Sequence, residues 1–152
     1  MENNIITITP NYNVYIKSTE DKGYGVFANR DIYKGELIET CYCVDASEIQ
    51  PTGALMDYVF NYPKGKTIQE GAKLVLPLGF GCIYNHADTN NATWSNHPTL
   101  DLHFEFKAIK DIKEGEEICT NYGHNYWPDH IKRSEHLERI QNKPKKIQDG
   151  NI

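Results

Sequence analysis

The segment LGFGCIYNH, at residues 78–86, ends on an asparagine and a histidine that follow a backbone containing two glycines. Asn85 and His86 together offer amide and imidazole hydrogen-bonding groups next to a flexible backbone. By itself, a histidine in this position is more typical of a buried side chain that is hydrogen-bonded to the backbone. Two other segments favour a functional interpretation of His86. They are GYG at residues 23–25 and NYG at residues 121–123, which also place glycine beside residues able to form hydrogen bonds.

The two shorter segments each allow a structural and a functional interpretation. In GYG, two glycines let the backbone approach a ligand closely or turn tightly, and a tight turn is the commoner outcome. In NYG, Tyr122 precedes a glycine at the end of an expected strand, where its hydroxyl can project into a cleft or simply end the strand. The dinucleotide-binding glycine pattern and the phosphate-binding loop are both absent, because further glycines that these motifs need are missing.

Length and composition are those of one globular domain. The chain has 152 residues, of which 39% are hydrophobic and 24% charged, as in a folded rather than a disordered protein. No run of about 18 apolar residues occurs, so we expect no membrane span. The first residues lack the basic stretch of a signal peptide, and we therefore expect an intracellular protein.

Charge is distributed unevenly along the chain. Residues 1–129 hold 10 Lys and Arg against 18 Asp and Glu, whereas residues 130–152 hold 6 against 3. The acidic body argues against direct nucleic-acid binding, which relies on clustered positive charge. It would attract a basic peptide, although it is equally compatible with solubility alone.

Four cysteines, at positions 41, 43, 82 and 119, include no CxxC pair. A structural zinc site usually needs two closely spaced pairs. We therefore expect no metal site, and we interpret the cysteines as thiols buried as small hydrophobic side chains.

Local patterns predict a mostly β fold. The clearest strand is expected at residues 102–108, where Leu102, Phe104, Phe106 and Ala108 alternate with polar residues. One helix is expected at residues 129–141, followed by a frayed basic tail. Many short strands with little helix favour non-local β pairing over a parallel βαβ sheet. The other expected strands lie at residues 13–17, 23–28, 36–44 and 117–122.

The order GYG, NH, NYG, with its spacing and flanking residues, resembles the SET-domain protein-lysine methyltransferases. The similarity runs from about residue 14 to residue 127, and in size and lack of flanking domains the chain is most similar to the minimal viral members. It implies a SET domain at residues 12–127, built of small curved sheets (a β-clip) with a C-terminal pseudoknot, and a helix with a basic tail at residues 128–152. The matching segments are GYGVFA (23–28), KGELIE (34–39), DYVF (57–60), LGFGCIYNH (78–86), IKEGEEI (112–118) and NYG (121–123).

The resemblance also implies an activity: transfer of a methyl group from S-adenosylmethionine to a lysine amine, without a metal. Its substrate would be a basic protein segment such as a histone tail. The alternative is a catalytically inactive SET-like module that binds a peptide or a protein partner. The small viral relatives imply a possible homodimer, and a viral or bacterial protein could act in the nucleus or cytoplasm of a host.

The roles that the resemblance implies fall into three groups. Tyr122 is the catalytic residue at the pore where the methyl group passes. The cofactor-binding residues are Lys22, Gly23, Tyr24, Gly25, Asn85, His86, Tyr122 and Trp127, and the lysine channel is lined by Tyr58, Thr120, Tyr122 and Tyr126.

Three departures from the family pattern concern the same site. The common sequence Asn-His-Ser-Cys-x-Pro-Asn is replaced by NHADTNN at residues 85–91, which keeps Asn85, His86 and Asn91. No cysteine follows Cys119, so a zinc-binding cluster after the domain is not expected. The position two residues before the catalytic tyrosine, where Phe or Tyr often tunes the number of methyl groups added, is Thr120.

Overall fold

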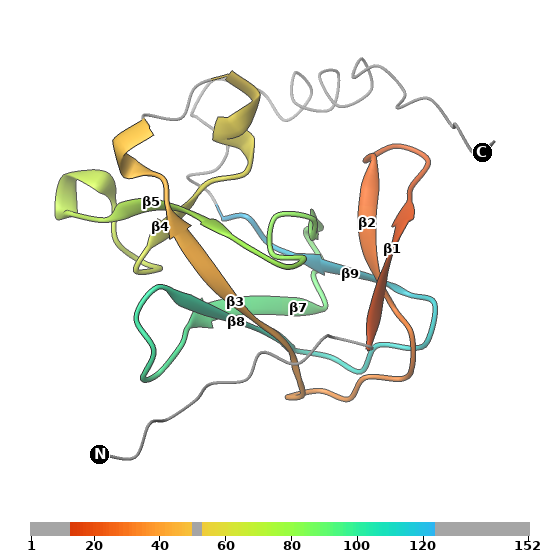
Figure 1. Ribbon diagram of the computed structural model, residues 1–152. Coiled ribbons are helices and arrows are strands. Elements are labelled where there is room, and N and C mark those ends of the chain that lie inside the picture. Colours follow the sequence, from red (N-terminus) through yellow and green to blue (C-terminus); the bar gives the residue numbers. More distant parts are fainter. Residues whose placement is uncertain (1–12, 50–52, 124–152) are drawn as a thin grey trace.

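Two small β-sheets form the body of the computed structural model, which describes residues 13–49 and 53–123 (Figure 1). The first sheet has the strand order β1-β2-β9-β6, with β1 at Val14–Ser18, β2 at Tyr24–Ala28, β9 at Glu117–Thr120 and β6 at Asn85–His86. The second has the order β4-β5-β3-β8-β7, with β4 at Phe60–Tyr62, β5 at Lys73–Pro77, β3 at Leu37–Asp45, β8 at His103–Ala108 and β7 at Ala92–Asn96. This mostly β architecture confirms the predicted fold class.

All pairings between these strands are antiparallel except that of β6 with β9, which is parallel. Three short 3-10 helices lie between β3 and β5: η1 at Ser47–Ile49, η2 at Gly53–Asp57 and η3 at Ile68–Glu70. Antiparallel neighbours need only short turns, whereas the parallel pair joins segments far apart in the sequence. The long connection from β6 to β9 therefore carries the whole β7–β8 hairpin.

The alternation at residues 103–108 works as the sequence predicts. Phe104, Phe106 and Ala108 face the core, and the polar residues between them face outward. The core cluster also includes Val26 and Ile118 from the first sheet and Val75 from the second, so both sheets share one hydrophobic core. Burying side chains of this kind contributes roughly 1.5–3 kcal/mol each.

The expected strand bounds hold to within one residue for β1, β2, β3 and β8, and the expected end of the last strand is wrong. Leu102 was expected inside a strand, but its φ of 54° places it in a left-handed turn and the strand begins at His103. The last strand was expected to reach Tyr122 and ends at Thr120. The expected helix at 129–141, the tail, Tyr126 and Trp127 lie outside the described residues.

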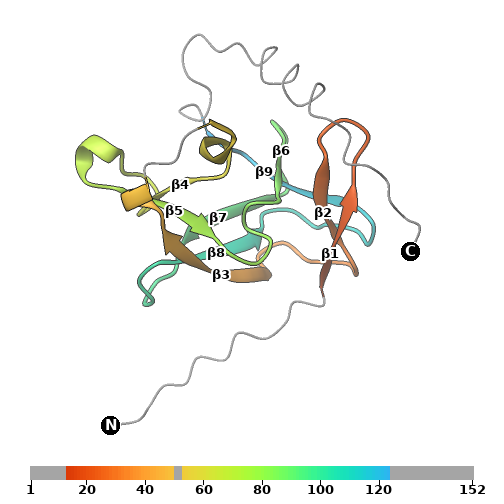
Figure 2. The ribbon, with the colours of Figure 1, turned by 45° about the horizontal axis from the view of Figure 1, so that its top comes forward.

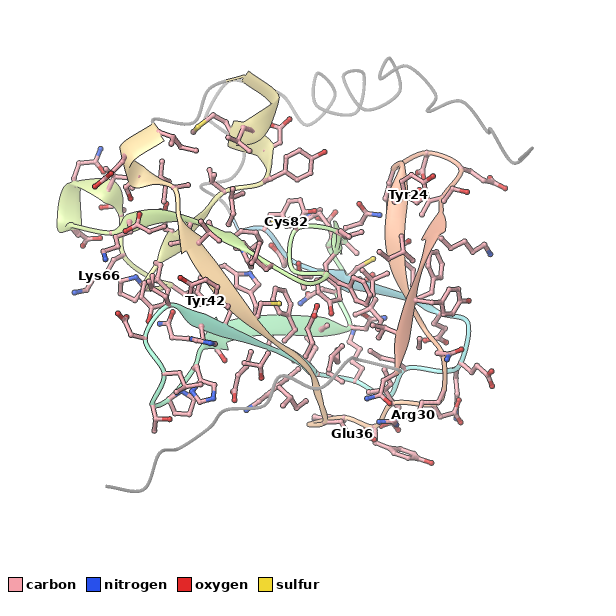
Figure 3. The ribbon with its side chains drawn as sticks, in the orientation of Figure 1. Tyr24, Arg30, Glu36, Tyr42, Lys66 and Cys82 are labelled. Carbon is pink, nitrogen blue, oxygen red and sulfur yellow. The ribbon has the colours of Figure 1, made fainter. Side chains whose placement is uncertain are left out.

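A charged cluster joins the loops at the far end of the molecule from the 3-10 helices. Arg30 and Glu36, side by side in Figure 3, form an ion pair of 2.7 Å, and the Arg30 Nε donates to Asn13 Oδ1. The ion pair, together with the Tyr33 amide that donates to Glu36, lowers the pKa of the Glu36 carboxyl. These groups are exposed, so their contribution to stability is small.

Candidate functional site

The predicted tyrosine segment and the Asn-His segment lie side by side. β6 pairs in parallel with β9, with Asn85 opposite Cys119 and His86 opposite Thr120 (Figure 2). Beyond the strand, the Tyr122 amide donates to His86 Nδ1 at 3.1 Å, which fixes the first residue after the pairing. The Asn-His and tyrosine segments, which lie far apart in the sequence, are thus neighbours in the structure.

His86 acts as an acceptor and as a donor at once. Because Nδ1 accepts from the Tyr122 amide, a neutral imidazole carries its proton on Nε2. Nε2 lies 3.0 Å from Asp88 Oδ1, the acceptor that this tautomer needs. The imidazole ring also packs against the Tyr122 ring, with centroids 5.3 Å apart. His86 therefore orients the backbone and the ring of Tyr122.

The hydroxyl of Tyr122 has a defined direction. Its Oη donates to the main-chain carbonyl of Tyr84 at 2.6 Å. Tyr84 immediately precedes the Asn-His pair, so the same segment holds the Tyr122 backbone on one side and its hydroxyl on the other. A phenol fixed at both ends is suited to positioning a reacting group.

Asn85 connects the GYG segment to β9. Its Nδ2 donates to the Tyr24 carbonyl at 3.1 Å and to Glu117 Oε1 at 2.8 Å. The other oxygen of Glu117 lies 3.9 Å from the Lys22 ammonium. Lys22, Tyr24, Asn85 and Glu117 therefore form one polar cluster, defined here as the GYG cluster.

Gly25 is required for this close approach. A Cβ at this position would lie 2.6 Å from Glu117 Oε1 and 3.0 Å from Asn85 Nδ2. Gly23 has a different role, because its φ of 76° closes the turn in which the Thr19 amide donates to the Gly23 carbonyl. The tight turn is thus confirmed at Gly23, whereas Gly25 allows a close approach of the protein's own side chains, and the approach of a ligand stays a prediction.

Tyr24 lies at the loop end of β2, where half of its surface is exposed (Figure 3). Thr120 is buried at the end of β9, with 1% of its surface exposed. Tyr58, one residue beyond η2, is partly exposed, and its carbonyl accepts from the Cys82 thiol at 3.5 Å. The roles of Thr120 and Tyr58 in a lysine channel stay predictions.

Asn91, the last residue of the NHADTNN segment, holds β9 by its side chain. Its Nδ2 donates to the Glu117 carbonyl at 2.8 Å, and its Oδ1 accepts from the Cys119 amide at 2.9 Å. Its own amide donates to the Cys119 carbonyl at 3.2 Å. An asparagine can satisfy a donor and an acceptor of one strand together, which accounts for its place at the edge of β9.

Three site residues escaped sequence reasoning: Glu117, Tyr84 and Glu39. Glu117 was predicted only as the first residue of the strand expected at residues 117–122, and the approach of Gly25 to its carboxyl in the folded structure shows its role. Glu39 had a usable signal, because it precedes Cys41 by two residues and Cys43 by four, which places it on the buried face of the same strand. Burial raises the pKa of the Glu39 carboxyl.

Cysteine burial follows the expectation for three of the four thiols. Cys41, Cys43 and Cys119 are buried, whereas Cys82 is partly exposed and donates to the Pro77 carbonyl at 3.3 Å. Within residues 13–49 and 53–123, no three His, Cys, Asp or Glu side chains gather closely enough to hold a metal ion. No helix in the described part of the chain is long and apolar enough to cross a membrane.

Known proteins resemble this chain in sequence and in structure. An H3 lysine-37 specific histone-lysine N-methyltransferase from Schizosaccharomyces pombe is 31% identical over 117 residues, which span 74% of each chain. A variant-silencing SET domain-containing protein from Plasmodium falciparum is 30% identical over 125 residues, but the chain spans only 5% of that protein.

The crystal structure of a candidate histone methyltransferase from Plasmodium falciparum superposes with a TM-score of 0.62 at 32% identity. The superposition covers 76% of this chain and 97% of that one. The SET domain model matches residues 23–123, from the first glycine of GYG to the last glycine of NYG. The chain belongs to the SET-domain family.

Proposed function

We propose that this protein is an S-adenosylmethionine-dependent protein-lysine N-methyltransferase that acts on a basic protein segment such as a histone tail. The observation that carries the proposal is the placement of Tyr122, whose hydroxyl donates to the Tyr84 carbonyl and whose amide donates to His86. Asn85, which joins the GYG cluster, is the residue between Tyr84 and His86. An inactive peptide-binding module would not need a phenol whose hydroxyl and backbone are both held in this way. The names of the relatives support the same activity.

The GYG cluster fits the methionine part of the cofactor. The lack of a Cβ at Gly25 lets the Asn85 and Glu117 side chains pack against this backbone, which holds the cluster together. Both side-chain hydrogen bonds of Asn85 in the described structure use its Nδ2, so Oδ1 is available to accept from an ammonium group. The Lys22 ammonium is the matching partner for a carboxylate. Lys22, Gly23, Tyr24, Gly25, Asn85 and His86 would hold the cofactor, with Trp127 over its adenine.

The cofactor supplies a methyl group on a positively charged sulfur. The attacking lysine must be neutral, although its usual pKa is about 10.4. A channel lined by aromatic rings disfavours the ammonium form, and a neighbouring positive charge acts in the same direction. Tyr58 and Tyr126 would guide the incoming cation by their ring faces. The Tyr122 hydroxyl and the nearby carbonyls would align the amine with the methyl group.

Removing one hydroxyl tests the assignment. Incubated with labelled cofactor and a histone mixture, the isolated wild-type protein is expected to transfer label to lysine. Tyr122→Phe is expected to lose most of this activity, about a hundredfold or more, while calorimetry gives an unchanged cofactor affinity. Normal turnover by Tyr122→Phe would show that the catalytic residue is wrongly assigned. A wild-type protein with neither transfer nor cofactor binding would favour the inactive module.

The remaining expectations belong to the same proposal. We propose that the protein works inside a cell, as a minimal SET enzyme of the viral type, and that two copies associate. Light scattering coupled to size-exclusion chromatography measures the copy number. A peptide-array assay read by mass spectrometry measures the target lysine and the number of methyl groups added, which Thr120 leaves open.

A further inference from the structure

A buried carboxyl group lies behind the residue that accepts the Tyr122 hydroxyl. Tyr84 makes two contacts in opposite directions: its main-chain carbonyl accepts from Tyr122 Oη, and its own hydroxyl donates to Glu39 Oε1, each at 2.6 Å. Tyr84 is only 2% exposed. The three residues form a continuous chain from β3 to the end of β9, defined here as the Glu39–Tyr84–Tyr122 chain.

Glu39 is itself fixed in its pocket. Its Oε2 accepts from the Phe80 amide at 3.3 Å, and the Cys41 side chain also hydrogen-bonds to the carboxyl. A Cβ at Gly79 would lie 2.8 Å from the same Oε2. The carboxyl thus contacts the start of the loop that leads to Tyr84 as well as the Tyr84 hydroxyl at its end.

The Tyr84 ring is clamped between this carboxyl and the core. It stacks on Phe106 of β8 with centroids 4.5 Å apart and planes at 20°. A ring held at its face and at its hydroxyl cannot rotate about its side-chain bonds. Because side chain and carbonyl belong to one residue, fixing the ring restricts where the carbonyl points.

We propose that Glu39 is a positioning residue that sets the direction of the Tyr122 hydroxyl through Tyr84. This proposal rests on the proposed function in one respect, namely that Tyr122 takes part in methyl transfer. Glu39 touches neither Tyr122 nor the GYG cluster in the contacts described, so it acts through its neighbour.

The chemistry favours positioning over simple stabilisation. Burying a carboxyl group costs free energy, and here burial is the largest influence on Glu39 and raises its pKa. A phenylalanine and an apolar residue of similar size would fill the same space without that cost. Such an apolar pair would lack the directional hydrogen bond that the Tyr84 hydroxyl donates to the Glu39 carboxyl.

The test compares Glu39→Gln and Tyr84→Phe, alone and together, with Glu36→Gln as the matched control. The same substitution at Glu36 changes an exposed carboxyl only three residues earlier. The first measurement is the carbon NMR signal of the Tyr122 ring carbon bonded to oxygen, in protein with labelled tyrosine. The signal is assigned by its loss in Tyr122→Phe.

We expect the Tyr122 signal to move in Glu39→Gln and in Tyr84→Phe, with the double variant no different from either one. The control leaves it unchanged. In steady-state assays kcat falls about ten- to a hundredfold, whereas KM for the peptide and the cofactor affinity stay the same. A lower kcat caused by partial unfolding would instead leave the signal of the folded fraction where it is.

An unmoved signal in folded variants overturns the proposal, as do additive effects of the two substitutions or a normal kcat. If Glu39→Gln does not fold, Tyr84→Phe decides by the same measurements. If the wild-type protein transfers no methyl group, the proposed function fails, and the NMR result still decides whether Glu39 sets the Tyr122 hydroxyl.

Discussion

Gly25 is the residue at which the smallest change should damage the proposed cofactor site most. In Gly25→Ala the new Cβ would lie 2.6 Å from Glu117 Oε1 and 3.0 Å from Asn85 Nδ2. The Asn85 amide must then move, and overpacking of this kind costs about 1–3 kcal/mol. We expect cofactor affinity, measured by calorimetry, to fall about tenfold or more.

Gly35→Ala is the control for the effect of an alanine in itself. Gly35 has a φ of 90° and nothing within 4 Å of a built Cβ, so alanine there is strained but meets no neighbour. It should lower the free energy of unfolding by about 1 kcal/mol and leave cofactor affinity unchanged. Equal affinities of the two variants would show that crowding at Gly25 does not disturb the proposed cofactor site.

Glu39 should make stability depend on pH in the direction opposite to most carboxyl groups. Burial raises its pKa in the folded state above the ordinary value of a glutamate carboxyl. The folded protein therefore binds this proton more tightly than the unfolded chain, and the stabilisation present below the unfolded pKa is lost as pH rises through the folded pKa. A tenfold difference in proton affinity between the folded and unfolded states corresponds to about 1.4 kcal/mol.

The measurement is the free energy of unfolding of wild type minus that of Glu39→Gln, from pH 4 to pH 8. We expect this difference to fall as pH rises. Exposed carboxyls with lowered pKa, such as Asp31 and Asp45, act in the opposite direction but contribute equally to both proteins. A difference that is flat or rises with pH would show that the Tyr84, Phe80 and Cys41 donors outweigh burial.

At the scale of elements, β9 depends on the side chain of Asn91. Asn91→Ala removes the amide nitrogen that donates to the Glu117 carbonyl and the amide oxygen that accepts from the Cys119 amide. Leaving these partly buried backbone groups unpaired should cost about 1–3 kcal/mol, measured by urea unfolding. Because β9 leads to Tyr122, kcat should fall as well.

Asn90 provides a neighbouring control. Among the described residues its side chain donates only to the Ala92 carbonyl, at 2.9 Å, so Asn90→Ala should cost less and leave kcat near that of wild type. Asn91→Asp should resemble Asn91→Ala, since a carboxylate can accept from Cys119 but cannot donate to Glu117. Full activity of Asn91→Asp would mean that the strand holds its position without this bond.

Elements with regular local patterns could be predicted from the sequence, and elements defined by distant partners could not. The alternation around Phe104 and Phe106 marks β8 without any tertiary information. β4, β5, β6 and β7 were not predicted. β4 has three residues and β6 only two, and β5 and β7 carry proline, polar and aromatic residues that suit a loop equally well. Their pairing partners, not their own patterns, make them strands.

The residues of the candidate site likewise include some that could be predicted from the sequence and some that could not. Asn85, His86 and Tyr122 could be found because the family resemblance preserves their motifs, and the structure brings them together. Glu117 and Tyr84 act through contacts across 32 and 38 residues of sequence. The spacing of residues along the chain does not indicate such long-range contacts, so no local pattern predicts the roles of Glu117 and Tyr84.

At the scale of the whole molecule, the two sheets should behave as one cooperative unit. Ile118 of the first sheet and Phe104 of the second belong to the same core cluster. A shared core means that neither sheet can open without exposing the apolar surface of the other. Buried cysteine thiols can report whether the two sheets open together, because they occur in both sheets. Cys41 and Cys43 lie in β3, and Cys119 lies in β9.

These thiols should resist alkylation in the folded protein. Burial raises the pKa of Cys43 to about 12 and those of Cys82 and Cys119 to about 11, and it raises the pKa of Cys41 as well. Only the thiolate reacts, so at pH 8 both the ionised fraction and the access are low. We expect Cys82, the one partly exposed thiol, to react first, and the other three to react slowly.

Cooperativity predicts how those three react. With Cys82→Ala as the background, Cys41, Cys43 and Cys119 should be labelled at the same rate, and that rate should rise in parallel as urea lowers the free energy of unfolding. Mass spectrometry of peptides at successive times measures the three rates separately. Earlier labelling of Cys119 would mean that β9, and with it the site, opens while the five-stranded sheet stays closed.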